Sequence, residues 1–420
     1  MLPTMTTPPT PTIKVGVGGE RLFAGLIMAA LLVHLPGLAL VPIAVIPALF
    51  LAVPLIWSAD SVVRRIAGVA AAAAIAGLLL RFFVSHNLGD VAVWGSVLLW
   101  LCATPVLVAA AGWALKRIKL RTGILLALAG GIISTALNIG LEWKGTLGIF
   151  ATGFVLVLLA RRPLLSLAAL AGVTFASFVN DARSMAVAGA AAFVLMLIVQ
   201  GRQRGGLART VKVLVATVVL GGALLWVLTS GLAGTQVQIR TLDQLSRANV
   251  LFGFRAEWAV TLSLFQSQPL GFGVGATPSD AQAGAGVAAV QAAGGDYLSR
   301  YFSDIVLGDR VDLHSTTANL WFHFGVVGVV LALLLAVVLF RGVRDYGPSA
   351  GTLGVGGMFL ILMSAWDLLF SPMADVDRLI IGILIALAVT GRAARSREEI
   401  SSLQASAESP LRQRRLSRSR

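Results

Sequence analysis

Three polar side chains in this apolar chain have the chemistry of a reaction site: His314, Arg183 and Arg255. A histidine ring titrates near the working pH, so it can accept a proton from a hydroxyl group. An arginine stays charged, and its planar guanidinium can donate to two phosphate oxygens at once. One base and two fixed cations at a membrane surface would suit chemistry on a lipid-linked anion, provided that the fold brings them to the same side.

The elements that must position these residues are membrane-spanning helices. The chain is 57% hydrophobic and only 12% charged, whereas soluble domains carry about 25% charged residues. Apolar runs of about 20 residues recur along the sequence, and a helix needs about that length to cross the hydrocarbon core. The runs are continuous rather than alternating, which argues against a β-barrel. We therefore predict an all-α, polytopic membrane protein with about twelve transmembrane helices. The predicted spans are 22–36, 38–57, 66–84, 91–113, 122–140, 145–160, 163–180, 184–200, 211–230, 315–340, 352–371 and 377–391.

The net charge of +14 follows the pattern of a membrane protein. With both termini placed in the cytosol, most Lys and Arg residues fall inside and most acids fall outside, which is the positive-inside bias. We therefore expect membrane lipids and no nucleic acid as partners. The chain divides into a disordered cytosolic N-terminus (1–21), transmembrane helices one to nine (22–230), one large outer loop (231–313), helices ten to twelve (314–391) and a basic cytosolic tail (392–420). The first span is expected to act as an uncleaved anchor.

The outer loop is long for a compact protein, and such loops are usually functional. Its middle, residues 245–270, has apolar residues at helical spacing and predicts a helix lying along or near the membrane surface. The stretch GFGVGATPSD that follows reads as turn and loop. It lacks the full G-x-G-x-x-G and a strand–helix context, so we reject a dinucleotide site there.

Each of the three candidates also has a simpler explanation. Arg183 could be a snorkelling side chain at a helix end, although it opposes the positive-inside trend. Arg255 could lie on a solvated face or pair with Glu257 or Asp243. His314 could be a polar interfacial residue at a helix start.

The remaining His and Cys residues do not form a metal site. At 100° per residue, His323 lies on the opposite helix face from His314, so the two cannot share a metal, and His323 is expected to pack. His34 is expected to pack as well, and His86 to lie in an outer loop. Cys102 is the only cysteine, so no intrachain disulfide can form. No His, Cys or carboxylate cluster has zinc-like spacing.

Three motifs, taken in their order, resemble the O-antigen ligase and polymerase superfamily. The stretch HSTTANLWFHFGVVG, which begins at His314, resembles the family's outer His followed by a polar stretch and G-x-x-G entering a helix. The stretch RAEWAVTLSLFQSQPLGFGVG resembles the family's "R…W…PLxGxGxG" segment, and DARSMAVAG resembles its "S-R" helix start. The resemblance covers roughly residues 180–340, and the topology is similar too. Two positions depart from the pattern: Ser315 stands where the family often has Asn, and Ser184 follows Arg183 instead of preceding an Arg.

The resemblance implies glycan transfer from undecaprenyl diphosphate to a hydroxyl of an acceptor such as lipid A–core, on the periplasmic side of the bacterial inner membrane. His314 would take the proton of the acceptor hydroxyl, and Arg255 and Arg183 would stabilise the diphosphate leaving group. A weaker third cation and three residues within the motifs would contact the substrates: Arg81, Trp258, Gly273 and Asn319. The implied enzyme is a metal-independent glycosyltransferase without a cofactor.

Other functions stay open from the sequence alone. A polymerase of O-antigen or exopolysaccharide shares these motifs, and we favour a ligase because only one large outer loop is evident. A secondary transporter or flippase would place its substrate near the bilayer midplane, on broken helices, whereas this chain keeps its midplanes apolar. A peptidoglycan-type polymerase is less favoured. The outer acids Asp375 and Asp377 could hold a divalent ion, but we expect the arginines to supply the positive charge instead.

Overall fold

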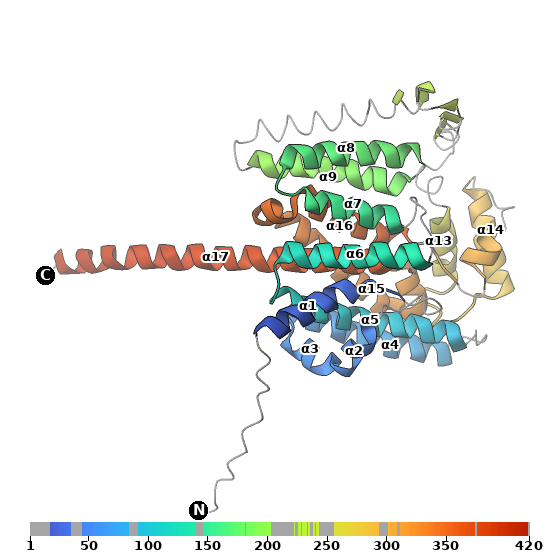
Figure 1. Cartoon of the computed structure of the whole chain (residues 1–420). Helices are drawn as coiled ribbons and strands as arrows, with labels where there is room; N and C mark the ends of the chain where they lie inside the picture. The colour runs from blue at the N-terminus through green and yellow to red at the C-terminus, as the bar shows by residue number, and fades with distance from the viewer. Residues whose placement is uncertain are drawn as a thin grey trace, which may run out of the picture.

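The computed structural model describes residues 17–34, 44–83, 91–138, 146–180, 182–202, 256–293, 301–308, 311–373 and 376–418, with isolated residues between 222 and 242. Within these ranges the regular structure is helical and contains no strand (Figure 1). The helices are α1 (Val17–Ala30), α2 (Val45–Phe50), α3 (Ala52–Ser58), α4 (Ser61–Phe83), α5 (Val91–Leu115), α6 (Leu120–Asn138), α7 (Thr146–Leu158), α8 (Pro163–Val179), α9 (Arg183–Arg202), α13 (Glu257–Ser267), α14 (Asp280–Ala292), η1 (Tyr301–Val306), α15 (Thr316–Arg344), η2 (Gly347–Ser349), α16 (Ala350–Phe370) and α17 (Val376–Arg418).

Several of these helices are built to cross a membrane. In the described ranges, six are long and apolar enough to do so, namely α4, α5, α6, α15, α16 and the first part of α17. The helices α7, α8 and α9 are apolar but shorter. The chain is therefore an all-helical protein whose apolar helices are consistent with several membrane crossings, and the predicted number of about twelve is not confirmed.

Ten of the twelve predicted spans coincide with one helix each, and the span 38–57 does not. The part of this span that the structure describes, from Ala44 onward, forms two short helices, α2 and α3, which meet at Leu51. Pro54 has no N–H to bond to the carbonyl of Phe50, four residues earlier, and its ring crowds that carbonyl, which favours a break at this point. The other exception, the predicted span 211–230, lies largely outside the described residues.

The buried apolar residues form two separate large cores. One fills the bundle and is built from α1 and α4 to α9 together with α15 to α17. The other lies in part of the predicted outer loop, where α13, α14, η1 and the first residues of α15 pack together around Val260, Val290, Val306 and Phe322. Figure 1 shows α13 and α14 at one end of the bundle, with the projecting part of α17 at the opposite end. The described part of the loop is therefore a small helical unit with its own core, rather than a single surface helix.

Helix α15 is interrupted by Gly325, whose φ of 62° and ψ of −145° are not helical. The part after the break, Val326–Arg344, is about 28 Å long at the rise of an α-helix. That length is close to the roughly 30 Å thickness of a hydrocarbon core. The part before the break, Thr316–Phe324, is therefore an additional short helix at the end of a complete span. Glycine suits this break because it adopts a positive φ without the strain that a Cβ atom would cause.

Candidate functional site

His314 lies just before α15 in a conformation that few residues adopt. Its φ is 48°, and it is the one non-glycine residue with a positive φ in the described part of the chain. Non-glycine residues in this region carry backbone strain, and such residues concentrate at functional sites. The side chain is 23% exposed, so the ring is held by the protein and still reaches solvent.

Two neighbours hold His314 in this conformation. The carboxylate Oδ1 of Asp312 accepts from the backbone N–H of His314 at 3.0 Å and from Nδ2 of Asn319 at 2.8 Å. The side-chain Oδ1 of Asn319 accepts from the N–H of Leu313 at 2.9 Å. Ser315 caps α15 by accepting from the N–H of Ala318. The oxygen and the nitrogen of the Asn319 side-chain amide thus both bond to the segment 312–314 and hold it against the first turns of α15. Asn319 itself is buried, at 1% exposure.

Asp312 and Asn319 form a clamp around the backbone of His314, and the imidazole has a preferred orientation within it. Its Nδ1 lies 3.3 Å from the carbonyl oxygen of Asp312 and 3.9 Å from the carboxylate Oδ1. The ring of Tyr301 packs edge-on against it at 5.4 Å between centroids, and the Tyr301 hydroxyl donates to Glu257 at 2.8 Å. With Nδ1–H donating to the carbonyl of Asp312, Nε2 is left as the proton-accepting nitrogen.

A glycine-rich segment, residues 269–275, packs against α15 beside the break at Gly325. The N–H groups of Phe272 and Gly273 donate to the carbonyl of Phe322, and the indole N–H of Trp321 donates to the carbonyl of Pro269. The first two bonds satisfy the Phe322 carbonyl, which lies in the turn before the interruption at Gly325. A Cβ atom on Gly325 would meet the carbonyl oxygen of Leu270, so the close approach requires glycine there.

The same segment contacts the end of α4 through Arg81. This side chain is buried, at 8% exposure, and its Nη1 donates to the carbonyl of Val274 at 2.6 Å. Gly273 has a φ of 97°, and a Cβ atom there would lie 2.8 Å from the Cα of Arg81. Arg81 and Gly273, both expected to contact substrate, therefore lie together and join α4 to the first part of α15.

A second layer of polar residues lies beside the start of α15. The hydroxyl of Thr316 donates to the carbonyl of Asp367, near the end of α16. The carboxylate of Asp367 accepts from the hydroxyl of Ser371 at 2.6 Å and pairs with Arg378 at 3.2 Å, almost entirely buried. This network fastens the ends of α15, α16 and α17 to each other next to His314.

Two other histidines, His34 and His323, have different surroundings in the structure. His34 was expected to pack only, but its Nε2 lies 2.6 Å from Oδ2 of Asp377. Asp377 is thus engaged by a histidine, while Asp375 lies outside the described residues. His323 is buried between the rings of Phe322 and Phe324, as expected for a packing residue. The helical-wheel argument that separated it from His314 does not apply, because α15 begins only at Thr316.

The structure brings only some of the predicted site residues together. Arg255 and His86 lie outside the described residues. Arg183 is the first residue of α9, and its side chain is not described. Since Met196, late in α9, lies beside the start of α16, Arg183 lies toward the other end of α16, where α15 begins. Trp258 is half-buried in the first turn of α13.

Sequence reasoning missed Asp312 and Tyr301, which contact His314. It considered Glu257 only as a partner of Arg255, whereas Glu257 accepts from the Tyr301 hydroxyl. Only Asp312, two residues before the histidine, carried a local signal, because Asp side chains commonly accept from a backbone N–H two residues on. In the described residues no group of three or more His, Cys, Asp or Glu side chains has the geometry of a metal site. Comparison with protein-family models and with curated proteins finds no match.

Proposed function

We propose that this chain is an integral membrane glycosyltransferase of the O-antigen ligase type. It would move a glycan from undecaprenyl diphosphate to a hydroxyl of an acceptor such as lipid A–core, on the periplasmic side of the inner membrane. The observation that supports this most is His314. Its imidazole is partly exposed, and Asp312 and Asn319 hold its backbone in a strained conformation at one end of an apolar helix bundle.

The chemistry assigned to His314 is general-base catalysis. The acceptor hydroxyl gives its proton to Nε2 as its oxygen forms a bond to the anomeric carbon of the donor glycan. The bond between that carbon and the diphosphate oxygen breaks, and its electron pair leaves with undecaprenyl diphosphate. This single displacement inverts the anomeric centre. Orientation by the Asp312 carbonyl matters because it keeps the proton on Nδ1 and the lone pair on Nε2.

The leaving group develops negative charge, and fixed cations would stabilise it. Arg255 and Arg183 carry this role in the proposal on the basis of the sequence. Arg81 has a different part: its guanidinium donates to the Val274 carbonyl and fastens the glycine-rich segment to α4. No metal ion is required in this scheme, because the donor already contains an activated bond and the arginines supply the charge.

A secondary transporter or flippase is the alternative that one observation favours. Both α15 and α16 are interrupted by a glycine with positive φ, Gly325 and Gly354, and transporters bind substrates on interrupted helices near the midplane. In this chain, however, the helix after Gly325 is long enough to span by itself, and Gly354 is only a few residues from the start of α16. These breaks lie toward helix ends, which suits a site at a membrane surface.

A deletion strain complemented with variants tests the proposed function. Loss of a ligase should leave lipopolysaccharide bare, with lipid-linked polymer accumulating. Loss of a polymerase, the alternative within the same superfamily, should leave core carrying a single repeat. Complementation by the wild-type chain but not by His314→Asn supports transfer, because Asn accepts a positive φ and removes only the base. A deletion that leaves the lipopolysaccharide bare while the lipid-linked glycan accumulates on the cytosolic face of the membrane, instead of the periplasmic face, would indicate transport.

A further inference from the structure

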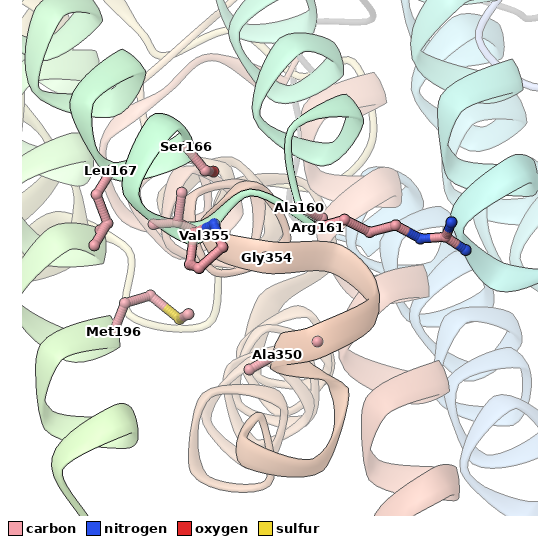
Figure 2. A pocket seen from close by; sticks show the side chains of 10 residues that line it. Ala160, Arg161, Ser166, Leu167, Met196, Ala350, Gly354 and Val355 are labelled. Carbon is pink, nitrogen blue, oxygen red and sulfur yellow. The ribbon is translucent and has the colours of Figure 1, made fainter.

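The end of the bundle opposite His314 contains a cavity of about 420 Å³, within the usual size range of ligand pockets. It lies between the turn joining α7 to α8, the start of α8, α9 and the start of α16, as Figure 2 shows. The buried residues Ser166, Met196 and Val355 form its floor. Arg161 and Gly351 form part of its exposed rim.

The break in α16 creates this hollow. Gly354 has a φ of 58°, and a Cβ atom there would lie 2.7 Å from the Cα of Ala160. The hydroxyl of Tyr346 donates a hydrogen bond to the carbonyl oxygen of Gly354 at 2.7 Å. The turn before the break is thereby set apart from the rest of α16, and Gly351 faces open space, with no atom within 4 Å of a Cβ built there.

The rim is cationic and the floor is mostly apolar. Arg161 lines the rim, and Arg162 follows it in the same exposed turn. Arg121 donates to the carbonyl of Leu158, at the end of α7 just before this turn. The residues that line the cavity include no acid. In Figure 2 the Arg161 side chain extends away from the apolar side chains of Leu167 and Met196. A molecule with an anionic head and an apolar chain would match both parts.

The surroundings of the cavity indicate a lipid rather than a soluble anion. Leu164, in the first turn of α8, is 83% exposed beside the rim, which places apolar surface where the headgroups of a bilayer would meet its hydrocarbon. This end of the bundle is also the end from which α17 projects (Figure 1), the side expected to face the cytosol. The cytosolic leaflet carries anionic lipid, which attracts Lys and Arg near its surface.

We propose that this cavity binds one anionic phospholipid of that leaflet, with the headgroup at Arg161 and Arg162 and an acyl chain over Met196 and Val355. The start of α8 adds to the headgroup site. Its Arg162 cap makes no side-chain hydrogen bond to the first turn, and the N-terminal end of a helix favours negative charge. This lipid site is separate from His314 and does not depend on glycan transfer.

Native mass spectrometry of the full-length protein tests the proposal, after incubation with phosphatidylglycerol or phosphatidylcholine vesicles. The wild type should retain one phosphatidylglycerol in preference to phosphatidylcholine. Gly351→Trp should fill the cavity and abolish the bound lipid. Gly172→Trp is the matched control, because Gly172 is exposed on α8 and a Cβ there also meets nothing within 4 Å.

A double variant of exposed residues, Arg161→Gln with Arg162→Gln, keeps the test independent of folding. It should lower the preference for phosphatidylglycerol roughly 30-fold, because each surface arginine contributes about 1 kcal/mol to anionic-lipid binding and the variant removes two. Inorganic phosphate should not displace the lipid, and displacement would indicate a free anion as the ligand. Equal lipid retention by Gly351→Trp and the wild type, or an unchanged lipid preference in the arginine variant, would overturn the proposal.

Discussion

Replacing Asn319 with Ala should release His314 from its strained conformation. The change leaves the N–H of Leu313 without its acceptor and removes the amide that donates to Asp312. An unpaired buried N–H costs about 1–3 kcal/mol, and a hydrogen bond to a charged group contributes about 1.5–3 kcal/mol. The clamp that Asp312 and Asn319 form therefore contributes about 2.5–6 kcal/mol, more than the roughly 1–2 kcal/mol that a left-handed residue costs. Without the clamp, a negative φ becomes the lower-energy state for His314.

The assay is the rate of glycan transfer at saturating donor, measured beside thermal unfolding. A reacting group displaced by about 1 Å can cost roughly 100-fold in rate, so kcat of Asn319→Ala should fall by about that factor. Asn138→Ala is the matched control. The side chain of Asn138, like that of Asn319, makes two hydrogen bonds, which it donates to the carbonyls of His34 and Ser134, but it does not touch the segment 312–314. If Asn319→Ala kept the kcat of the wild type while its fold stayed intact, positioning of His314 by the clamp would be refuted.

Three further predictions concern the helix breaks and the chemistry. Gly325→Ala combines a positive φ with a Cβ that overlaps a loop carbonyl, so it should lower the free energy of unfolding by about 2–5 kcal/mol. Gly68→Ala, where the Cβ meets nothing, should not, and equal stabilities would contradict the assigned break. Tyr346→Phe should cost about 1–3 kcal/mol by leaving the Gly354 carbonyl unpaired. Burial raises the pKa of Tyr346 above that of an unfolded tyrosine. The stabilisation by its hydroxyl should therefore be complete below about pH 10 and be lost as the pH rises further. A difference in the free energy of unfolding between wild type and variant that stays constant above about pH 10 would oppose the assignment. Purified protein should keep its transfer activity in excess chelator, and a loss restored by magnesium would require a metal in the mechanism.

The positions of most helices followed from the sequence, because runs of about 20 apolar residues have few other structural solutions. The interruptions did not. Gly325 and Gly354 stand in apolar stretches where a glycine is equally compatible with close helix packing. Only the contacts made by the glycine-rich segment and by Tyr346 distinguish the two uses. Pro54, by contrast, gave a readable signal against the long span 38–57.

The candidate site was predictable to a similar degree. His314 was identified because its residue type is rare in this chain and its place before an apolar helix is distinctive. The partners Tyr301 and Glu257 belong to segments far apart in sequence, which meet only because the outer-loop residues build a core of their own. Helix α14 supplies part of that core, and its start was signalled by the capping box of Ser279 and Gln282.

The most direct test of the proposed function is transfer by the purified protein in vesicles that contain an undecaprenyl-diphosphate-linked glycan and an acceptor. Release of undecaprenyl diphosphate would be measured together with formation of the glycosylated acceptor. The wild type should produce both in equal amounts, and His314→Asn should produce neither while binding the donor as before. Full transfer by His314→Asn, or the absence of transfer by the wild type together with movement of intact donor between leaflets, would contradict the proposed function.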